Sequence, residues 1–132
     1  MDVFFYGLFM DPEVIRAKGL NPENIRKASA PGLALRIGQR ATLTKAPDSR
    51  THGMLMALTP DEIDLLYSEK SVSTYRSEAI TVELTDGSQV SALCFNLPRV
   101  PGPDEANPEY ALKLRDLARR LGLPSDYVSN FR

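Results

Sequence analysis

Glu69 is the residue whose position most invites a chemical explanation. It follows the segment TPDEIDLLY (59–67), in which Thr59 and Glu62 have the spacing of a capping box that begins a helix. The helix should end near Ser68, so the Glu69 carboxylate would lie at the negative end of the helix dipole, where a cation is normally favoured. From this position alone, a solvated loop glutamate and a group that transfers protons both remain open.

Other residue types that commonly do chemistry are scarce. His52 is the sole histidine, and its place between a Pro/Asp/Ser segment and an apolar run favours an exposed loop over a triad or a metal site. Cys94 is the sole cysteine, so neither an intramolecular disulfide nor a thiolate zinc cluster can form. No G-x-x-x-x-G-K-[ST] or G-x-G-x-x-G motif occurs, which argues against an NTPase or a dinucleotide enzyme. What remains is the chemistry of one carboxylate and of loop backbone groups.

The composition predicts one domain, residues 1–132. The chain has 42% hydrophobic and 25% charged residues, enough apolar content to bury a core. Its formal net charge of -1 gives no general reason to expect nucleic acid or an anionic membrane as a partner. Residues 16–50 contain eight Lys/Arg against only Glu23 and Asp48. Because these charges are dispersed, a solvated basic face is the favoured interpretation, and attraction of an anionic ligand is the alternative.

The cellular location predicted by the sequence is the cytoplasm. A single cysteine suits a reducing compartment. The start MDVFFYGLFM has no basic region and soon meets Asp11-Pro12, so it resembles a first strand more than a signal peptide. No segment has the length of apolar residues that a membrane span requires.

The first half of the chain predicts a strand, a short helix and two further strands. Residues 3–7 (VFFYG) are apolar and aromatic, as in a buried strand, and residues 12–18 form a helix between Asp11-Pro12 and a glycine. Residues 30–44 alternate loosely, with glycines that indicate bends or bulges. Residues 46–53 (APDSRTHG) are expected to be a loop, and 53–58 (GMLMAL) another strand.

The second half predicts a hairpin and a long helix. Residues 79–95 alternate apolar and polar positions on both sides of Asp86-Gly87, the pattern of a β-hairpin. The proline-rich stretch 96–108 should be an extended loop. A helix then begins after Asn107 and ends at Gly122, and residues 125–131 (SDYVSNF) add a final turn.

This order of elements predicts an α+β fold with a mixed or mostly antiparallel sheet, closed into a small β-barrel with flanking helices. The regular strand and helix alternation of a doubly wound fold is missing.

Three segments occur in an order typical of one family. They are FFYGLFM (4–10), HGMLMALTPDEIDLLYSEKSVSTYRSEAITVELTDGS (52–88) and NPEYALKLRDLARRLGLPSDYV (107–128). Together they resemble the γ-glutamylcyclotransferase-like superfamily, in its AIG2-like and γ-glutamylamine cyclotransferase branch. The resemblance covers nearly the whole chain. Members of the family share a "YG-x-L" loop after the first strand, where this chain has YGLF (6–9), and a "DG" hairpin, which is Asp86-Gly87 here.

The resemblance implies a small mixed β-barrel and a reaction that needs neither metal nor cofactor. In this reaction a γ-glutamyl amino acid or γ-glutamylamine cyclises to 5-oxoproline and releases its amine. Glu69 would be the general acid and base. The residues implied in substrate binding are Tyr6, Gly7, Leu8, Phe9, Tyr75 and Tyr110.

One carboxylate is chemically sufficient for the proton transfers of this cyclisation. The α-amine of a γ-glutamyl amide is already placed to close a five-membered ring on the γ-carbonyl, so intramolecular geometry supplies much of the rate. Glu69 would take a proton from the amine and return it to the leaving nitrogen. Backbone N–H groups near Gly7 and Phe9 would bind the α-carboxylate or the developing oxyanion.

Two positions depart from the family pattern. Leu8 replaces the Ser or Thr that usually follows the loop glycine, and Leu66 replaces an aspartate that often stands three residues before the glutamate. A non-catalytic member that binds a small ligand with the same fold is therefore the main alternative. A nucleic-acid binder that uses residues 16–50 is a weaker one, since that segment has no aromatic-basic motif. The leaving amine, the use of glutathione and the oligomeric state stay open.

Overall fold

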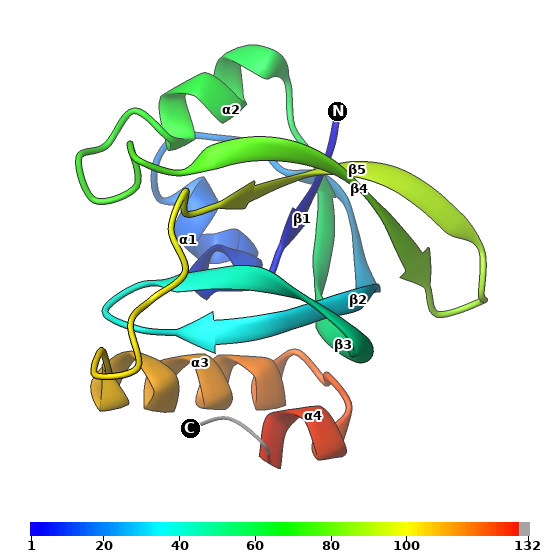
Figure 1. The fold of residues 1–132 in the computed structure, drawn as a ribbon. Helices are drawn as coiled ribbons and strands as arrows, with labels where there is room; N and C mark the ends of the chain where they lie inside the picture. Colours follow the sequence, from blue (N-terminus) through cyan, green and yellow to red (C-terminus); the bar gives the residue numbers. More distant parts are fainter. Residues whose placement is uncertain (130–132) are drawn as a thin grey trace.

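A computed structural model describes residues 1–129 and shows a five-stranded closed barrel with helices packed around it (Figure 1). The barrel order is β1-β3-β2-β4-β5. The strands are β1 (Asp2–Phe5), β2 (Glu23–Ile37), β3 (Ala41–Ala57), β4 (Arg76–Leu84) and β5 (Gln89–Asn96). The helices are η1 (Leu8–Met10), α1 (Pro12–Arg16), α2 (Pro60–Leu66), α3 (Pro108–Arg120) and α4 (Ser125–Ser129). The α+β barrel predicted from the sequence is confirmed.

A long hairpin of β2 and β3 forms the largest part of the barrel wall. Its antiparallel register runs from Arg26 opposite Leu55 to Ile37 opposite Ala41. The predicted loop at 46–53 is wrong, because these residues belong to β3. The register shifts between Pro31 and Leu33, so Pro47 falls in an irregular stretch where a proline does not remove a ladder hydrogen bond. The predicted strand at 30–44 is the second half of β2, the turn and the start of β3, and the first half of β2 was missed.

The remaining strands close the barrel. β4 and β5 form the predicted hairpin, with Asp86 accepting a hydrogen bond from the Ser88 backbone and Gly87 at a φ of 87°. β1 pairs antiparallel with β3 on one side and parallel with β5 on the other. The parallel pair is short, and it joins the first strand of the chain to the last.

The helices begin at the caps that the sequence predicts. Thr59 and Glu62 form both hydrogen bonds of the capping box of α2, and the helix ends at Leu66, within two residues of the predicted end. Asn107 caps α3 by accepting from the Tyr110 N–H. Asp11 caps α1 in the same way. α4 is the predicted final turn as far as residue 129, and the part of that prediction at 130–131 lies outside the described residues.

The main core lies between the barrel and its helices. Its most buried members are contributed by several elements and include Met10, Ile15, Met56, Leu66 and Leu114, each at most 1% exposed. Figure 1 shows α3 alongside the β2–β3 hairpin, with α4 folded back beside it. Leu66 is a core residue, so an aspartate at this place would be buried among apolar side chains.

The loop from residue 97 to 107 connects β5 to α3 without regular structure, as predicted. It supports the turn between β2 and β3, since Asn107 Nδ2 donates to the Gln39 carbonyl at 3.0 Å and the Glu105 carboxylate accepts from the Gln39 N–H. Within residues 1–129, no helix has the length and apolar character needed to cross a membrane.

Candidate active site

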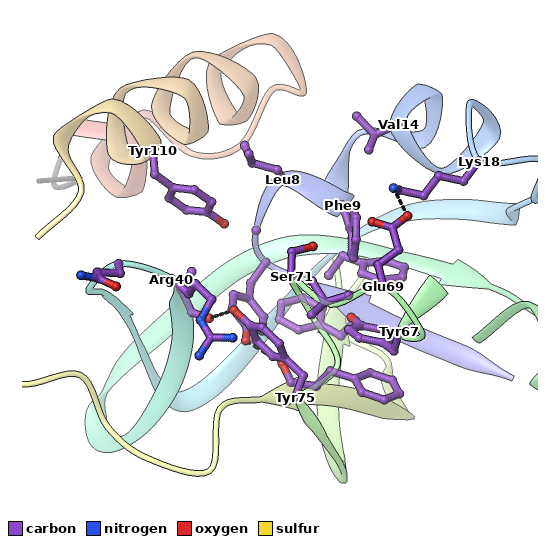
Figure 2. Close-up of a pocket in the computed structure, with 18 residues that line it drawn as sticks. Leu8, Phe9, Val14, Lys18, Arg40, Tyr67, Glu69, Ser71, Tyr75 and Tyr110 are labelled. Carbon is purple, nitrogen blue, oxygen red and sulfur yellow. Dashed lines mark hydrogen bonds and ion pairs between the residues drawn. The ribbon is translucent and has the colours of Figure 1, made fainter. Parts of the chain in front are cut away.

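A cavity of about 430 Å³ opens at one end of the barrel. Six parts of the chain form its wall: residues 4–9, residues 14 and 18 in and after α1, the turn 39–41, the loop 67–75, residue 95 of β5 and the start of α3 (Figure 2). All the residues predicted for the site line this cavity: Tyr6, Gly7, Leu8, Phe9, Glu69, Tyr75 and Tyr110. These positions come from distant parts of the chain, and the barrel closure brings them together.

Within residues 1–129, Glu69 is the only carboxylate that lines the cavity. α2 ends at Leu66, and a series of turns follows in which the Glu69 carbonyl accepts from the Val72 N–H at 3.1 Å. These turns hold the residue at the rim, where 47% of its side chain is exposed. A carboxylate in this position can exchange protons with a bound molecule while the apolar wall limits access of water.

Lys18 forms an ion pair with Glu69, at 2.5 Å from Nζ to Oε1. Its ammonium also lies over the ring of Phe9, 5.9 Å from the centroid. Figure 2 shows the two charged groups meeting at one end of the cavity. The sequence did not single out Lys18, and the basic excess of residues 16–50 was the only signal that pointed near it.

The loop after β1 approaches α3 closely. A Cβ atom on Gly7 would lie 2.7 Å from the Tyr110 hydroxyl oxygen, so glycine is needed here for space and not for an unusual φ. Burial, with a smaller contribution from Tyr75, raises the pKa of Tyr110 to about 12. The Tyr110 hydroxyl therefore stays neutral at physiological pH and keeps its own proton available to a ligand.

The floor of the cavity is aromatic and its hydroxyls are fixed. Tyr67 stacks on Phe95 with ring centroids 3.9 Å apart. The Tyr6 hydroxyl donates to the Phe95 carbonyl at 2.6 Å, and the Tyr75 hydroxyl donates to the Ala41 carbonyl at 2.5 Å. Burial raises the pKa of Tyr6, Tyr67 and Tyr75. The floor is thus a neutral, rigid surface that suits the methylene groups of a small substrate.

Arg40 is the second cation at the cavity. It lies in the turn between β2 and β3, donates from Nη1 to the Thr74 hydroxyl at 2.7 Å, and lies over the Tyr75 ring at 5.9 Å. Within the part of the chain that the structure describes, no residue of the proline-rich stretch 96–108 lines the cavity. The loop acts indirectly, since it supports the turn that carries Arg40.

His52 and Cys94 lie away from the cavity. His52 is half-buried in β3 beside Tyr127, with ring centroids 5.0 Å apart, so the expectation of an exposed loop histidine is wrong. Burial lowers the pKa of His52. Cys94 is fully buried in the barrel, and burial raises the pKa of its thiol to about 12. Neither residue contributes a nucleophile or base to the cavity.

Among residues 1–129, no group of three or more histidine, cysteine, aspartate or glutamate side chains is arranged to hold a metal ion.

Comparison with known proteins defines the class to which this barrel and cavity belong. Residues 3–113 match the family model described as gamma-glutamyl cyclotransferase, AIG2-like, and the chain belongs to this family. No curated protein sequence gives a match.

Solved structures show the same fold at low sequence identity. A structure named gamma-glutamyl cyclotransferase aligns with a TM-score of 0.80 and 17% identity, over 100% of this chain and 88% of that one. An uncharacterized human protein aligns with a TM-score of 0.79 and 17% identity, over 99% and 87%. A protein from Arabidopsis thaliana aligns with a TM-score of 0.69 and 19% identity, over 94% of both chains. At these identities the likeness establishes the fold alone.

Proposed function

We propose that this protein cyclises γ-glutamyl amino acids or γ-glutamylamines to 5-oxoproline, with Glu69 as the general acid and base. The observation that carries the proposal is the position of Glu69. In a chain of the gamma-glutamyl cyclotransferase, AIG2-like family, it is the only carboxylate that the described part of the chain places in the wall of a cavity sized for a small molecule.

The reaction moves two protons from the substrate's α-ammonium nitrogen, which has three protons in the substrate and one in the lactam. Glu69 takes the first proton, and the free amine attacks the γ-carbonyl carbon and forms the new C–N bond of the ring. The ring nitrogen then loses its second proton, the amide C–N bond breaks, and the leaving nitrogen takes one proton from Glu69 and the other from the ring nitrogen or solvent, so that the product leaves as an ammonium. Because nucleophile and carbonyl belong to one molecule, the enzyme has mainly to hold the substrate folded.

The loop after β1 and Tyr110 supply donors for the oxygen that gains charge. The first amides of a helical turn such as η1 lack acceptors within the helix, so the Phe9 N–H is available to a carboxylate or an oxyanion. The Tyr110 hydroxyl is neutral, because burial raises its pKa to about 12, and it can donate its proton. Leu8 adds no hydroxyl, so in this chain the donors come from the backbone and from α3.

A product assay tests the proposal. Purified protein is incubated with γ-glutamyl amino acids, γ-glutamylamines and glutathione, and 5-oxoproline and free amine are measured together. Equal release of both products by the wild type and its loss in Glu69→Gln support the proposal. Equal rates in the two proteins contradict the role of Glu69.

A second candidate function is binding of a γ-glutamyl compound without turnover. The Lys18–Glu69 ion pair favours it, because a carboxylate already paired with an ammonium is less free to accept a substrate's proton. Calorimetric binding of a γ-glutamyl compound that yields no 5-oxoproline would support this function over the first.

A further inference from the structure

We propose that Arg40 forms an anion subsite for the leaving group, so that the cavity prefers γ-glutamyl α-amino acids to γ-glutamyl compounds whose leaving amine carries no carboxylate. The proposal rests on the proposed function and names the substrate class within it. It assigns to Arg40 a role in specificity and no part in the proton transfer.

The charges of the cavity wall are unbalanced. Among residues 1–129, the charged residues of the wall are Lys18, Arg40 and Glu69, so two cations face one anion. Lys18 and Glu69 neutralise each other at 2.5 Å. In residues 1–129, Arg40 forms no ion pair within 4.0 Å, and its guanidinium hydrogen-bonds a neutral hydroxyl. The nearby Glu105 carboxylate accepts from the Gly102 and Gln39 N–H groups, with Arg40 further lowering its pKa.

Arg40 is held in a defined place at the cavity. Its Nη1 donates to Thr74 on the loop that carries Glu69, and its guanidinium lies over the Tyr75 ring. A guanidinium has five N–H donors, so one bond to Thr74 leaves donors for a carboxylate. Figure 2 shows Arg40 across the cavity from the Lys18–Glu69 pair. The two cations therefore define two separate ends of the site.

A γ-glutamyl amino acid has charges that match both ends. Its glutamyl head carries an ammonium and a carboxylate on one carbon, and this zwitterion is complementary to the Glu69 carboxylate and the Lys18 ammonium. Placing the head there leaves the second carboxylate, on the leaving amino acid, for Arg40. A γ-glutamylamine with a neutral substituent has no carboxylate to offer Arg40, and binding it leaves the guanidinium without a carboxylate at ion-pair distance.

The test compares two substrates that differ in one charge, γ-glutamyl-alanine and γ-glutamyl-alaninamide. We expect the wild type to show roughly tenfold higher kcat/KM for the carboxylate compound, the ratio that one charge-assisted contact of about 1.4 kcal/mol gives. Arg40→Met should lower this ratio to about one by acting on γ-glutamyl-alanine only, whereas Arg40→Lys should retain part of it. Arg36→Met, an exposed position of β2 outside the cavity, is the charge-matched control and should keep the wild-type ratio.

Three results would overturn the inference: equal rates for both compounds in the wild type, an equal loss for both in Arg40→Met, or the same loss of ratio in Arg36→Met. An equal loss for both compounds in Arg40→Met is the result expected if the contact between Arg40 and Thr74 has a purely structural role. If neither compound releases 5-oxoproline, the proposed function fails, and calorimetric binding decides the inference by itself. Tighter binding of γ-glutamyl-alanine that disappears in Arg40→Met supports it, and equal binding of both compounds contradicts it.

Discussion

Lys18 Nζ lies 2.5 Å from Glu69 Oε1, joining two residues 51 positions apart at the mouth of the cavity. The pair links the turn that follows α1 to the loop that follows α2. Neither segment belongs to a strand of the barrel. The pair determines which way the candidate catalytic carboxylate points before a substrate arrives. Any molecule that uses Glu69 must either displace Lys18 or bind both groups together.

Lys18→Met should distinguish these possibilities. If the substrate's zwitterionic head binds both groups, the variant loses a carboxylate contact, and KM should rise roughly tenfold for γ-glutamyl-alanine and γ-glutamyl-alaninamide alike. Thermal stability should change little, because an ion pair this exposed contributes less than about 1 kcal/mol. Steady-state kinetics and a melting curve provide the measurements. A lower KM in the variant would show instead that Lys18 only competes with the substrate for Glu69.

Gly7→Ala should disturb the site through Tyr110. The added methyl would lie 2.7 Å from the Tyr110 hydroxyl, and we expect a loss of about 1–3 kcal/mol in the free energy of unfolding, with lower activity. Tyr110→Phe removes the clashing oxygen, so the double variant should lose less stability than the sum of the single ones.

Urea denaturation of the wild type, Gly7→Ala, Tyr110→Phe and the double variant measures the free energy that couples the two positions. Gly102→Ala is a suitable control, because the nearest atom to its added Cβ is 3.7 Å away, in ordinary contact. Strict additivity of Gly7→Ala and Tyr110→Phe would contradict the close approach of the loop and α3.

Because the pKa values of its tyrosines are raised, the protein should lose stability at high pH. Burial is the main cause that raises the pKa of all five tyrosines: Tyr6, Tyr67, Tyr75, Tyr110 and Tyr127. The pKa of Tyr110 reaches about 12. In the unfolded chain the tyrosines ionise near pH 10. Above that pH the unfolded state has released protons that the folded state still holds, so stability falls as pH rises. For Tyr110 the loss runs from about pH 10 to 12.

Urea denaturation across that range measures the effect. Each buried tyrosine should contribute a decrease of about 1.4 kcal/mol per pH unit while it remains protonated only in the folded state. Ultraviolet absorbance should show little tyrosinate in the folded protein at pH 10. Half-ionisation of the tyrosines at that pH in the folded state would contradict their burial.

Local signals in the sequence were sufficient for several elements. The Asp86-Gly87 turn between alternating strands and the Thr59–Glu62 capping box depend on residues close in sequence, and both are present. The segment 46–53 has the polar, Pro- and Gly-containing composition of a loop, whereas its strand pairing is set by residues 28–31, which lie on the other strand of the β2–β3 hairpin. Polar composition does not prevent a strand when the partner strand supplies the hydrogen bonds.

The sequence likewise predicts some residues of the candidate site and not others. The family resemblance located the positions that line the cavity, including Glu69 and Tyr110. It did not locate Lys18 or Arg40, since neither lies in a motif and each reaches the cavity only through packing of separate segments. Leu66 looked like a lost functional residue in the sequence, and in the structure it is a core residue.

The most direct test of the account is the kcat/KM of Glu69→Gln for the best γ-glutamyl substrate, measured by 5-oxoproline release. Glu23→Gln, an exposed residue at the start of β2 that does not line the cavity, is the matched control. We expect Glu69→Gln to fold normally and to lose roughly 100-fold or more in kcat/KM, the range in which a general acid–base group contributes, while Glu23→Gln keeps wild-type activity. A Glu69→Gln protein as active as the wild type would contradict the assignment of Glu69 as the catalytic acid and base.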